Sequence, residues 1–177
     1  MTKRSNFKRR KNDAYDTPVK AMTPLLPYLP KKCRFIEPCA GNGQMVDYFV
    51  EQGHECVDYF DLEPRRDDIK EFDAFDYSVA NYYDCDFIIT NPPWTRQLLH
   101  PMIELWASVR PTWVLFDSDW IFTKQAIPYL EYCHKIVSIG RVSWMDNGVS
   151  GKDNSAWFLF DKTTTRVTDG PVIYGTK

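Results

Sequence analysis

The chain has 177 residues, of which 44% are hydrophobic and 15% aromatic, with a formal net charge of -2 and a pI near 5.9. This length and composition suit one domain with an ordinary hydrophobic core and leave little room for a second domain. The slightly acidic balance excludes a protein that coats nucleic acid over its whole surface, although it allows a local basic patch. No apolar run approaches the roughly 18 residues of a membrane-spanning helix, so we expect no membrane partner.

The cysteines and the start of the chain indicate a compartment. The five cysteines are widely spaced, with no C-x-x-C pair and no histidine at ligand spacing, so we expect reduced thiols and no metal site. The basic first residues are not followed by an apolar stretch and a cleavage site, so no secretory signal is predicted. These features predict a cytoplasmic protein.

The clearest cationic feature is the start of the chain. Residues 1–14 lack apolar periodicity and are expected to form a flexible basic arm, followed by a single folded domain over residues 15–177. Such an arm is either a solubilising tail or a set of phosphate contacts that bind nucleic acid without reading its sequence. The residues expected to make such contacts are Lys8, Arg9, Arg10 and Lys11.

Hydrophobic spacing predicts strands that alternate with helices along the chain. Strands are expected over residues 34–36, 55–60, 68–76, 85–90, 112–116, 135–139 and 156–160. Helices are expected over residues 19–28, 44–51, 98–109 and 123–132. This alternation predicts an α/β fold with a mostly parallel, twisted sheet of about seven strands and helices on both faces.

A glycine-rich turn follows the first predicted strand. In open parallel sheets, ligands bind beyond the carboxyl ends of the strands, where this turn lies. Glycines at positions 41 and 43 let backbone amides approach a ligand, although a G-x-G pair alone is weak evidence. The residues singled out in the turn are Glu37, Pro38, Cys39, Gly41 and Gly43.

Asp61 ends the second predicted strand, about 20 residues after the turn, where an acid is expected to accept hydrogen bonds from ribose hydroxyls. Together with the turn it indicates an adenosine-containing cofactor. A dinucleotide is disfavoured because the helix start lacks the third glycine of such sites. A sulfonium cofactor without phosphates fits better, since Glu37 can hold a methionyl ammonium directly or through water.

The tetrapeptide Asn91-Pro92-Pro93-Trp94 follows the buried strand at 85–90. The two prolines fix the backbone and remove donors, which leaves carbonyl groups free to accept hydrogen bonds. The Asn91 side-chain oxygen and the Pro92 carbonyl suit the two protons of an exocyclic amino group and point its lone pair at a methyl donor. Trp94 is expected to stack on a base that has left the duplex. The alternative is an ordinary proline turn with Trp94 in the core.

Two other segments invite a chemical interpretation. Pro38-Cys39 has the form of a nucleophilic dipeptide, but it lies in the turn expected to hold the cofactor, so we assign Cys39 to packing. Asp117 and Asp119 form a carboxylate pair without a third oxygen ligand nearby, so we place them at the rim of a cleft and not at a metal site.

These motifs resemble the amino-methyltransferases of DNA, and among them the small adenine methyltransferases typical of phages and prophages. Tyr15-Asp16-Thr17-Pro18 is similar to the family's N-terminal cofactor motif, and its position ahead of the other motifs resembles the gamma arrangement. The resemblance implies a Rossmann-like class I methyltransferase fold, S-adenosylmethionine as cofactor and DNA as partner. It also implies methylation of the amino nitrogen of a flipped-out adenine, in a host cell's cytoplasm if a phage encodes the chain.

Carried over by position, the resemblance places Tyr15, Thr17 and Pro18 at the methionyl part of the cofactor. It places Asp73 at the cofactor's adenine amino group, followed by Phe75, with Asp76 as the alternative acid. Lys152 and Asn154, in a loop between the last two predicted strands, are implied to lie near nucleic acid.

Two departures from the family qualify the resemblance. Trp94 stands where tyrosine or phenylalanine is commoner, and no segment after the tetrapeptide is long enough to be a separate target-recognition domain. Methylation of RNA adenine, of a cytosine amino nitrogen or of a protein glutamine amide remains the alternative activity. A catalytically inactive cofactor-binding or DNA-binding protein is the other alternative.

Overall fold

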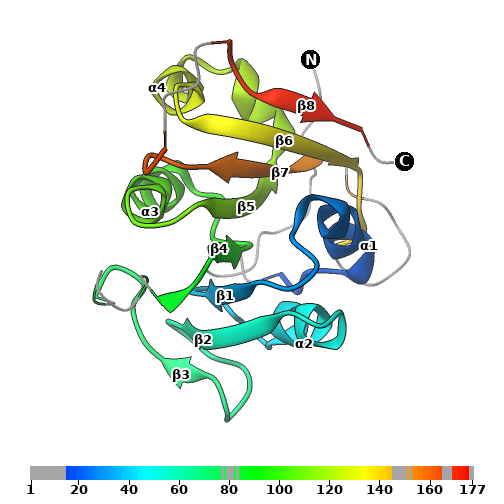
Figure 1. Cartoon of the computed structure of the whole chain (residues 1–177), viewed down its shortest axis with the longest axis vertical. Coiled ribbons are helices and arrows are strands. Elements are labelled where there is room, and N and C mark those ends of the chain that lie inside the picture. The colour runs from blue at the N-terminus through cyan, green and yellow to red at the C-terminus, as the bar shows by residue number, and fades with distance from the viewer. Residues whose placement is uncertain are drawn as a thin grey trace.

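The computed structural model describes residues 15–76, 78, 82, 84–144, 151, 153–164 and 169–175. An eight-stranded sheet with the order β3-β2-β1-β4-β5-β7-β6-β8 runs through it (Figure 1). Strand β7 is antiparallel to both of its neighbours, and the other paired strands are parallel. The predicted α/β fold with a mostly parallel sheet is therefore confirmed, with one strand more than expected.

The strands agree with the predicted positions except for the last. They are β1 (Arg34–Glu37), β2 (Glu55–Asp61), β3 (Lys70–Glu71), β4 (Phe87–Thr90), β5 (Thr112–Asp117), β6 (Cys133–Gly140), β7 (Ser155–Phe160) and β8 (Val172–Tyr174). Strand β8 was not predicted because it is only three residues long and two of them are exposed. Its place in the sheet depends on parallel pairing with β6, which local periodicity does not reveal.

Helix α2 has the predicted bounds and α3 the predicted length, shifted by two residues, whereas the other two predicted helices are divided into shorter pieces. They are α1 (Val19–Met22), η2 (Thr23–Tyr28), α2 (Gln44–Glu51), α3 (Arg96–Ala107), η4 (Ser118–Phe122), η5 (Lys124–Ala126) and α4 (Ile127–Leu130). The prediction of one helix over 19–28 was wrong in its second part, since prolines in η2 remove amide donors and a 3-10 helix forms instead. The helix predicted over 123–132 is likewise divided into η5 and the four-residue α4, with a proline in the first turn of α4.

Helices cover both faces of the sheet (Figure 1). Helices α1 and α2 lie on one side, and α3 and α4 lie on the other. Alternation along β5 explains this arrangement, because Trp113 and Leu115 join the buried cluster under α1 and α2, whereas Val114 and Phe116 join the cluster under α3. The sheet therefore separates two hydrophobic layers. Among the described residues, no helix has the length and apolar character to cross a membrane.

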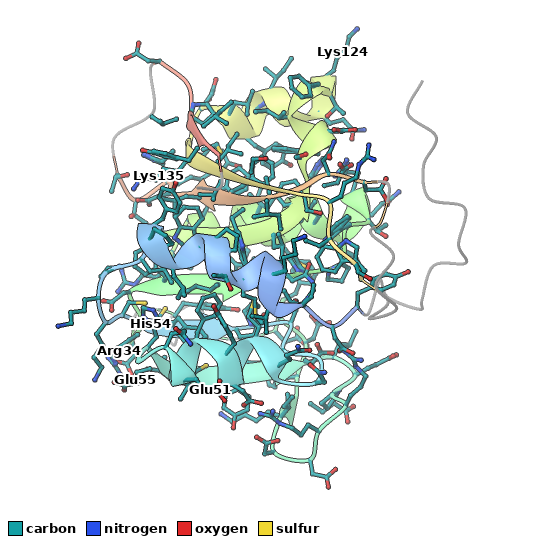
Figure 2. All side chains as sticks on the ribbon, turned by 90° about the vertical axis from the view of Figure 1, so that its right-hand side faces the viewer. Arg34, Glu51, His54, Glu55, Lys124 and Lys135 are labelled. Carbon is teal, nitrogen blue, oxygen red and sulfur yellow. The ribbon has the colours of Figure 1, made fainter. Side chains whose placement is uncertain are left out.

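The topology brings the carboxyl ends of β1, β4, β5 and β6 to one edge of the sheet, because these strands run in the same direction. In Figure 2, Arg34, His54 and Glu55 mark the opposite, amino edge, while Lys124 projects on the other side. Helix α1 is fixed against the sheet by the Trp157 indole, which donates a hydrogen bond to the Ala21 carbonyl at 2.8 Å. The segment before α1 is thereby held over the carboxyl edge.

Candidate active site at the carboxyl edge of the sheet

A cavity of about 420 Å³ lies at this carboxyl edge. Its volume is in the range of pockets that bind small molecules and cofactors. Most of the predicted cofactor-binding side chains line it, together with apolar residues of α3. The lining residues are Tyr15, Pro38, Cys39, Gly41, Asp61, Leu62, Glu63, Pro64, Arg65, Asp73, Ala74, Phe75, Asn91, Pro93, Leu98 and Met102.

The glycine turn between β1 and α2 is shaped by its own backbone. Gly41 and Gly43 have φ of 56° and 78°, in the left-handed region that side chains rarely adopt. The Gly41 amide donates to Asp61 Oδ2 at 2.8 Å, which ties the turn to the end of β2. Gly43 directly precedes α2, so the turn leads into a helix start.

Two arginines occupy the space over these glycines. A Cβ at Gly41 would lie 2.8 Å from Arg65 Nη2, and one at Gly43 would lie within 2.5 Å of the Arg66 guanidinium. The expectation that the missing side chains expose amides to a ligand is therefore incomplete, because in this structure they also make room for arginine. Arg65 also forms an ion pair with Asp16, whose Oδ1 accepts a hydrogen bond from Arg65 Nη2 at 2.6 Å. This ion pair connects the N-terminal motif to the loop after β2.

Three acids at this edge are fixed by local backbone amides. Glu37 Oε1 accepts from the Cys39 amide at 3.0 Å, and Asp61 Oδ1 accepts from the Glu63 amide at 2.8 Å. Asp73 Oδ1 accepts from the Phe75 amide at 2.9 Å. Each carboxylate therefore has a defined orientation and retains lone pairs for further partners. Asp73 lines the cavity and Asp76 does not.

Glu37 is fully buried at the end of β1. Burial raises the pKa of its carboxyl to about 8, against the opposing effects of the nearby Thr90 hydroxyl and the Cys39 amide. Its Oε2 and the Thr90 Oγ1 make no hydrogen bond to other described residues. A buried carboxyl with an unsatisfied oxygen is costly, and a bound ligand, an ion or an ordered water can supply the missing partner.

Cys39 lies beside this carboxyl and lines the cavity. Burial, with the added effect of Glu37 and Asp61, raises the pKa of its thiol well above the ordinary value. Because the thiolate is the nucleophilic form, this environment does not activate the side chain. The five cysteines are free thiols, three of them buried.

Asn91 directly follows β4 and connects the tetrapeptide to the N-terminal motif. Its Nδ2 donates to Thr17 Oγ1 at 3.0 Å, and its Oδ1 accepts from the Trp94 indole Nε1 at 3.1 Å. Thr17 is buried, whereas Pro18 caps the start of α1 and does not line the cavity. The structure thus brings the first and last predicted motifs into direct contact.

The rest of the tetrapeptide divides between the cavity and the core. Pro93 lines the cavity, while Pro92 is buried beneath it. Trp94 does not line the cavity but packs partly buried against the cluster that α3 and β5 share. Its ring also meets Trp144 edge-on, with centroids 5.4 Å apart and an interplanar angle of 90°. Stacking of a base on Trp94 therefore stays a prediction.

Trp144 belongs to the connection between β6 and β7, which begins and ends at the carboxyl edge. Gly140 and Ser155 are cross-strand partners at its two ends, and the Gly151 amide donates to the Val142 carbonyl at 2.9 Å. The Asn154 carbonyl accepts from the Ser118 amide at 2.9 Å, which joins this connection to the end of β5. Asn154 thus lies at the expected edge, whereas Lys152 falls outside the described residues.

Asp117 ends β5 at the carboxyl edge, and neither Asp117 nor Asp119 lines the cavity, so their place at the rim of a cleft stays a prediction. Burial raises the pKa of the Asp117 carboxyl. The Arg96 guanidinium acts in the opposite direction, with its Nη2 atom 3.8 Å from Asp117 Oδ2. The basic residues Lys8, Arg9, Arg10 and Lys11 lie outside the described residues. Among the described residues, the sequence prediction missed Arg65 and Trp144 and named Asp16 only as part of the N-terminal motif; the adjacent arginines at 65 and 66, four and five residues after Asp61, were the available signal for Arg65.

Comparison with known proteins identifies solved structures that have the same fold. The chain matches no known protein family and no curated protein sequence. Solved structures do match it. A type I restriction enzyme modification subunit from Vibrio vulnificus aligns with 91% of the chain at a TM-score of 0.60 and 13% identity. A protein assigned as an RNA methyltransferase from Pyrococcus horikoshii aligns with 92% of it at 0.60 and 14%. The chain therefore has the Rossmann-like α/β fold that these structures share.

A third solved structure agrees with this assignment of the fold. A dimethyladenosine transferase from Plasmodium falciparum aligns with 84% of the chain at a TM-score of 0.57 and 13% identity. The chain spans 46% of the Vibrio subunit, 63% of the Plasmodium enzyme and 94% of the Pyrococcus protein. The fold is thus shared over most of this chain, while the chain spans about half the length of the restriction-enzyme subunit.

Proposed function

We propose that this protein transfers a methyl group from S-adenosylmethionine to the exocyclic amino nitrogen of adenine in DNA, forming N6-methyladenine. The observation that carries the proposal is the Asn91 carboxamide on the lining of a cavity that also contains Asp61 and Asp73. A carboxamide oxygen at this place suits an amino group as hydrogen-bond donor. The methyltransferase fold of the chain is consistent with this chemistry.

The residues of the cavity fit this cofactor, together with Glu37, which lines a smaller pocket that shares Tyr15, Cys39, Gly41 and Asn91 with the cavity. The unsatisfied Glu37 oxygen is suited to the ammonium of the methionyl group, whose positive charge would also favour the ionised carboxylate. Asp61 retains lone pairs for ribose hydroxyls, and Asp73 with the Phe75 ring is suited to the adenine. When bound, the cofactor supplies an electrophilic methyl group on its sulfonium.

The chain's own contribution to the transfer is orientation. An exocyclic amine is a poor nucleophile because its lone pair is delocalised into the ring. In the proposed mechanism, Asn91 Oδ1 and the Pro92 carbonyl oxygen each accept a hydrogen bond from one N–H of the amine. These hydrogen bonds favour a tetrahedral nitrogen and direct its lone pair at the methyl donor. Alignment of this kind lowers the barrier by several kcal/mol, on the order of 7 in favourable cases. The nitrogen gains the methyl group and releases one proton to water, since a carboxamide is not a base.

Two features support a nucleic acid as substrate. The sequence places six basic residues among its first eleven, which suits phosphate contacts. The motif order of the chain resembles that of DNA adenine methyltransferases. RNA adenine is the second candidate, because the assigned RNA methyltransferase from Pyrococcus horikoshii is matched over 94% of its own length.

A labelled transfer assay tests this proposal. The protein is incubated with S-adenosylmethionine carrying a tritiated methyl group and, separately, with unmethylated DNA, RNA or cell protein. The products are digested and separated as nucleosides or amino acids. We expect the label in N6-methyladenine from DNA. Label only in RNA nucleosides would favour the second candidate, and label only in methylglutamine would exclude both.

The basic arm provides a separate test of nucleic-acid binding. Replacing Lys8, Arg9 and Arg10 with alanine is expected to weaken DNA binding and to flatten its salt dependence. Each lost phosphate contact lowers the slope of log K against log salt by about 0.9. Fluorescence anisotropy at several salt concentrations measures this slope. An unchanged slope would make the arm a solubilising tail.

A further inference from the structure

Trp94 makes a contact that stacking on a base does not require. Its indole Nε1 lies 3.1 Å from Asn91 Oδ1, three residues earlier in the chain. An indole nitrogen carries a proton and only donates hydrogen bonds. The atom of Asn91 that faces Trp94 must therefore be the oxygen, and the amide nitrogen must face Thr17.

The opposite side of the carboxamide is fixed by Thr17. Asn91 Nδ2 donates to Thr17 Oγ1 at 3.0 Å, across 74 positions of sequence. Thr17 is buried and lies two residues before the start of α1, which the Trp157 indole holds against β7. The acceptor for the amide nitrogen is therefore part of the packed fold.

Trp94 is itself held from two directions. It packs against the hydrophobic cluster shared by α3 and β5, and its ring meets Trp144 edge-on at 5.4 Å. An edge-to-face pair of this kind is a favoured arrangement of aromatic rings. The indole N–H is consequently directed at Asn91 by a fixed scaffold.

We propose that Trp94 is a positioning residue that, together with Thr17, locks the Asn91 carboxamide with its oxygen available to the substrate amine. This inference rests on the proposed function. Rotation of the carboxamide by half a turn would present two N–H donors to a donor amine. A carboxamide oxygen has two lone pairs, so Oδ1 accepts from Trp94 and from the substrate at the same time. Phenylalanine at this position would stack on a base equally but would not hold the oxygen.

Kinetics of matched tryptophan variants test the proposal. Trp94→Phe is expected to lower kcat about tenfold while KM for the nucleic acid and the dissociation constant of S-adenosylmethionine stay within about twofold. The control is Trp113→Phe, because Trp113 is buried in β5 and its indole nitrogen has no hydrogen-bond partner among the described residues. Its kcat is expected to match the wild type. A raised KM with unchanged kcat in Trp94→Phe would overturn the proposal in favour of stacking alone.

Thr17 offers a second kinetic arm with its own rescue. Thr17→Val removes the acceptor for Asn91 Nδ2 at nearly constant volume, and it is expected to reduce kcat to a similar degree. Thr17→Ser keeps the hydroxyl and is expected to restore most of the lost turnover. Equal turnover in the valine and serine variants would contradict the lock.

Nuclear magnetic resonance tests the contact in the protein alone. The six tryptophans give six indole N–H signals, and the one absent from Trp94→Phe is assigned to Trp94. Its exchange with solvent deuterium is expected to be slow in the wild type and at least tenfold faster in Asn91→Leu. In Asn91→Asp it is expected to remain slow, since the carboxylate still accepts the hydrogen bond. An equal exchange rate in Asn91→Leu would overturn the proposed positioning contact.

The two measurements separate this inference from the function it rests on. If the wild-type protein methylates no substrate, the proposed function fails. The exchange rates in the same protein still decide whether Trp94 holds the Asn91 oxygen.

Discussion

The two sides of the site are built by different means. On the acidic side, formed by Glu37, Asp61 and Asp73, each carboxylate accepts a hydrogen bond from the amide two residues later. On the tryptophan side, Asn91 accepts from Trp94 three residues later and donates to Thr17 from 74 positions earlier, while Trp94 meets Trp144. The acidic side is therefore fixed mainly by local backbone amides, with one longer contact from Gly41 to Asp61, whereas the tryptophan side depends more on contacts between distant segments. Substitutions should separate binding of the cofactor from transfer of the methyl group along this division.

The largest expected effect is on the tryptophan side. Asn91→Ala removes the acceptor for the substrate amine and is expected to lower kcat on the order of 10²- to 10³-fold, the range found when a group that stabilises a transition state is deleted. The dissociation constant of S-adenosylmethionine should change less than twofold, because the acidic side is intact. Steady-state kinetics and titration calorimetry measure the two quantities. Turnover equal to wild type would refute the role of Asn91.

The next effect is on the acidic side. Asp61→Ala removes a charged acceptor of the Gly41 amide and of the proposed ribose hydroxyls, so S-adenosylmethionine is expected to bind about 10- to 100-fold more weakly. Titration calorimetry measures this change. Asp84→Asn is the control, since Asp84 pairs with Arg34 at the amino edge. A weakening in the control as large as in Asp61→Ala would show that the loss is not specific to the site.

On the acidic side, Glu37 makes the stability of the protein depend on pH. Its pKa is about 8 in the folded protein and near 4.5 in the unfolded chain, so between these values the folded state holds a proton that the unfolded state has released. The contribution of Glu37 to the free energy of unfolding therefore falls as pH rises through this window, on the order of 1.4 kcal/mol per unit.

Glu37→Gln is thus expected to be close to neutral at pH 5 and to stabilise the protein by at least about 2 kcal/mol at pH 9, while cofactor binding weakens. Urea unfolding at the two pH values provides the measurement. Glu51→Gln, an exposed carboxyl on α2, should leave the pH dependence unchanged. A pH dependence identical in Glu37→Gln and wild type would contradict the shifted pKa.

The smallest expected effect concerns the ion pair between Asp16 and Arg65, whose side chains are each 37% exposed. Such pairs contribute between 0 and about 1 kcal/mol, and salt weakens them further. A double-mutant cycle with Asp16→Asn and Arg65→Met should give a coupling free energy below about 1 kcal/mol. Coupling that rises when S-adenosylmethionine is bound would link the pair to the cofactor. A coupling of several kcal/mol would contradict its surface character.

The difference between local and long-range contacts also explains which parts of the site could be predicted from the sequence. The acids at the ends of β1 and β2 and the tetrapeptide after β4 were predicted because strand, turn and acid are adjacent in the chain. The contact between Thr17 and Asn91 spans 74 positions, and Trp144 reaches Trp94 from the connection between β6 and β7. No local pattern encodes such contacts. The helix over 123–132 failed for a related reason, since apolar spacing does not register the proline that interrupts the hydrogen-bond ladder.

The pairing of Gly140 with Ser155 has a consequence for how the length of the chain can change in evolution. Residues 141–154 connect two residues, Gly140 and Ser155, that are paired in the sheet. The length of this connection can therefore vary while β6 and β7 keep their register. Doubling the length of such a loop costs only about 0.6 kcal/mol in closure entropy. Insertions between these two strand ends are therefore expected to cost little stability.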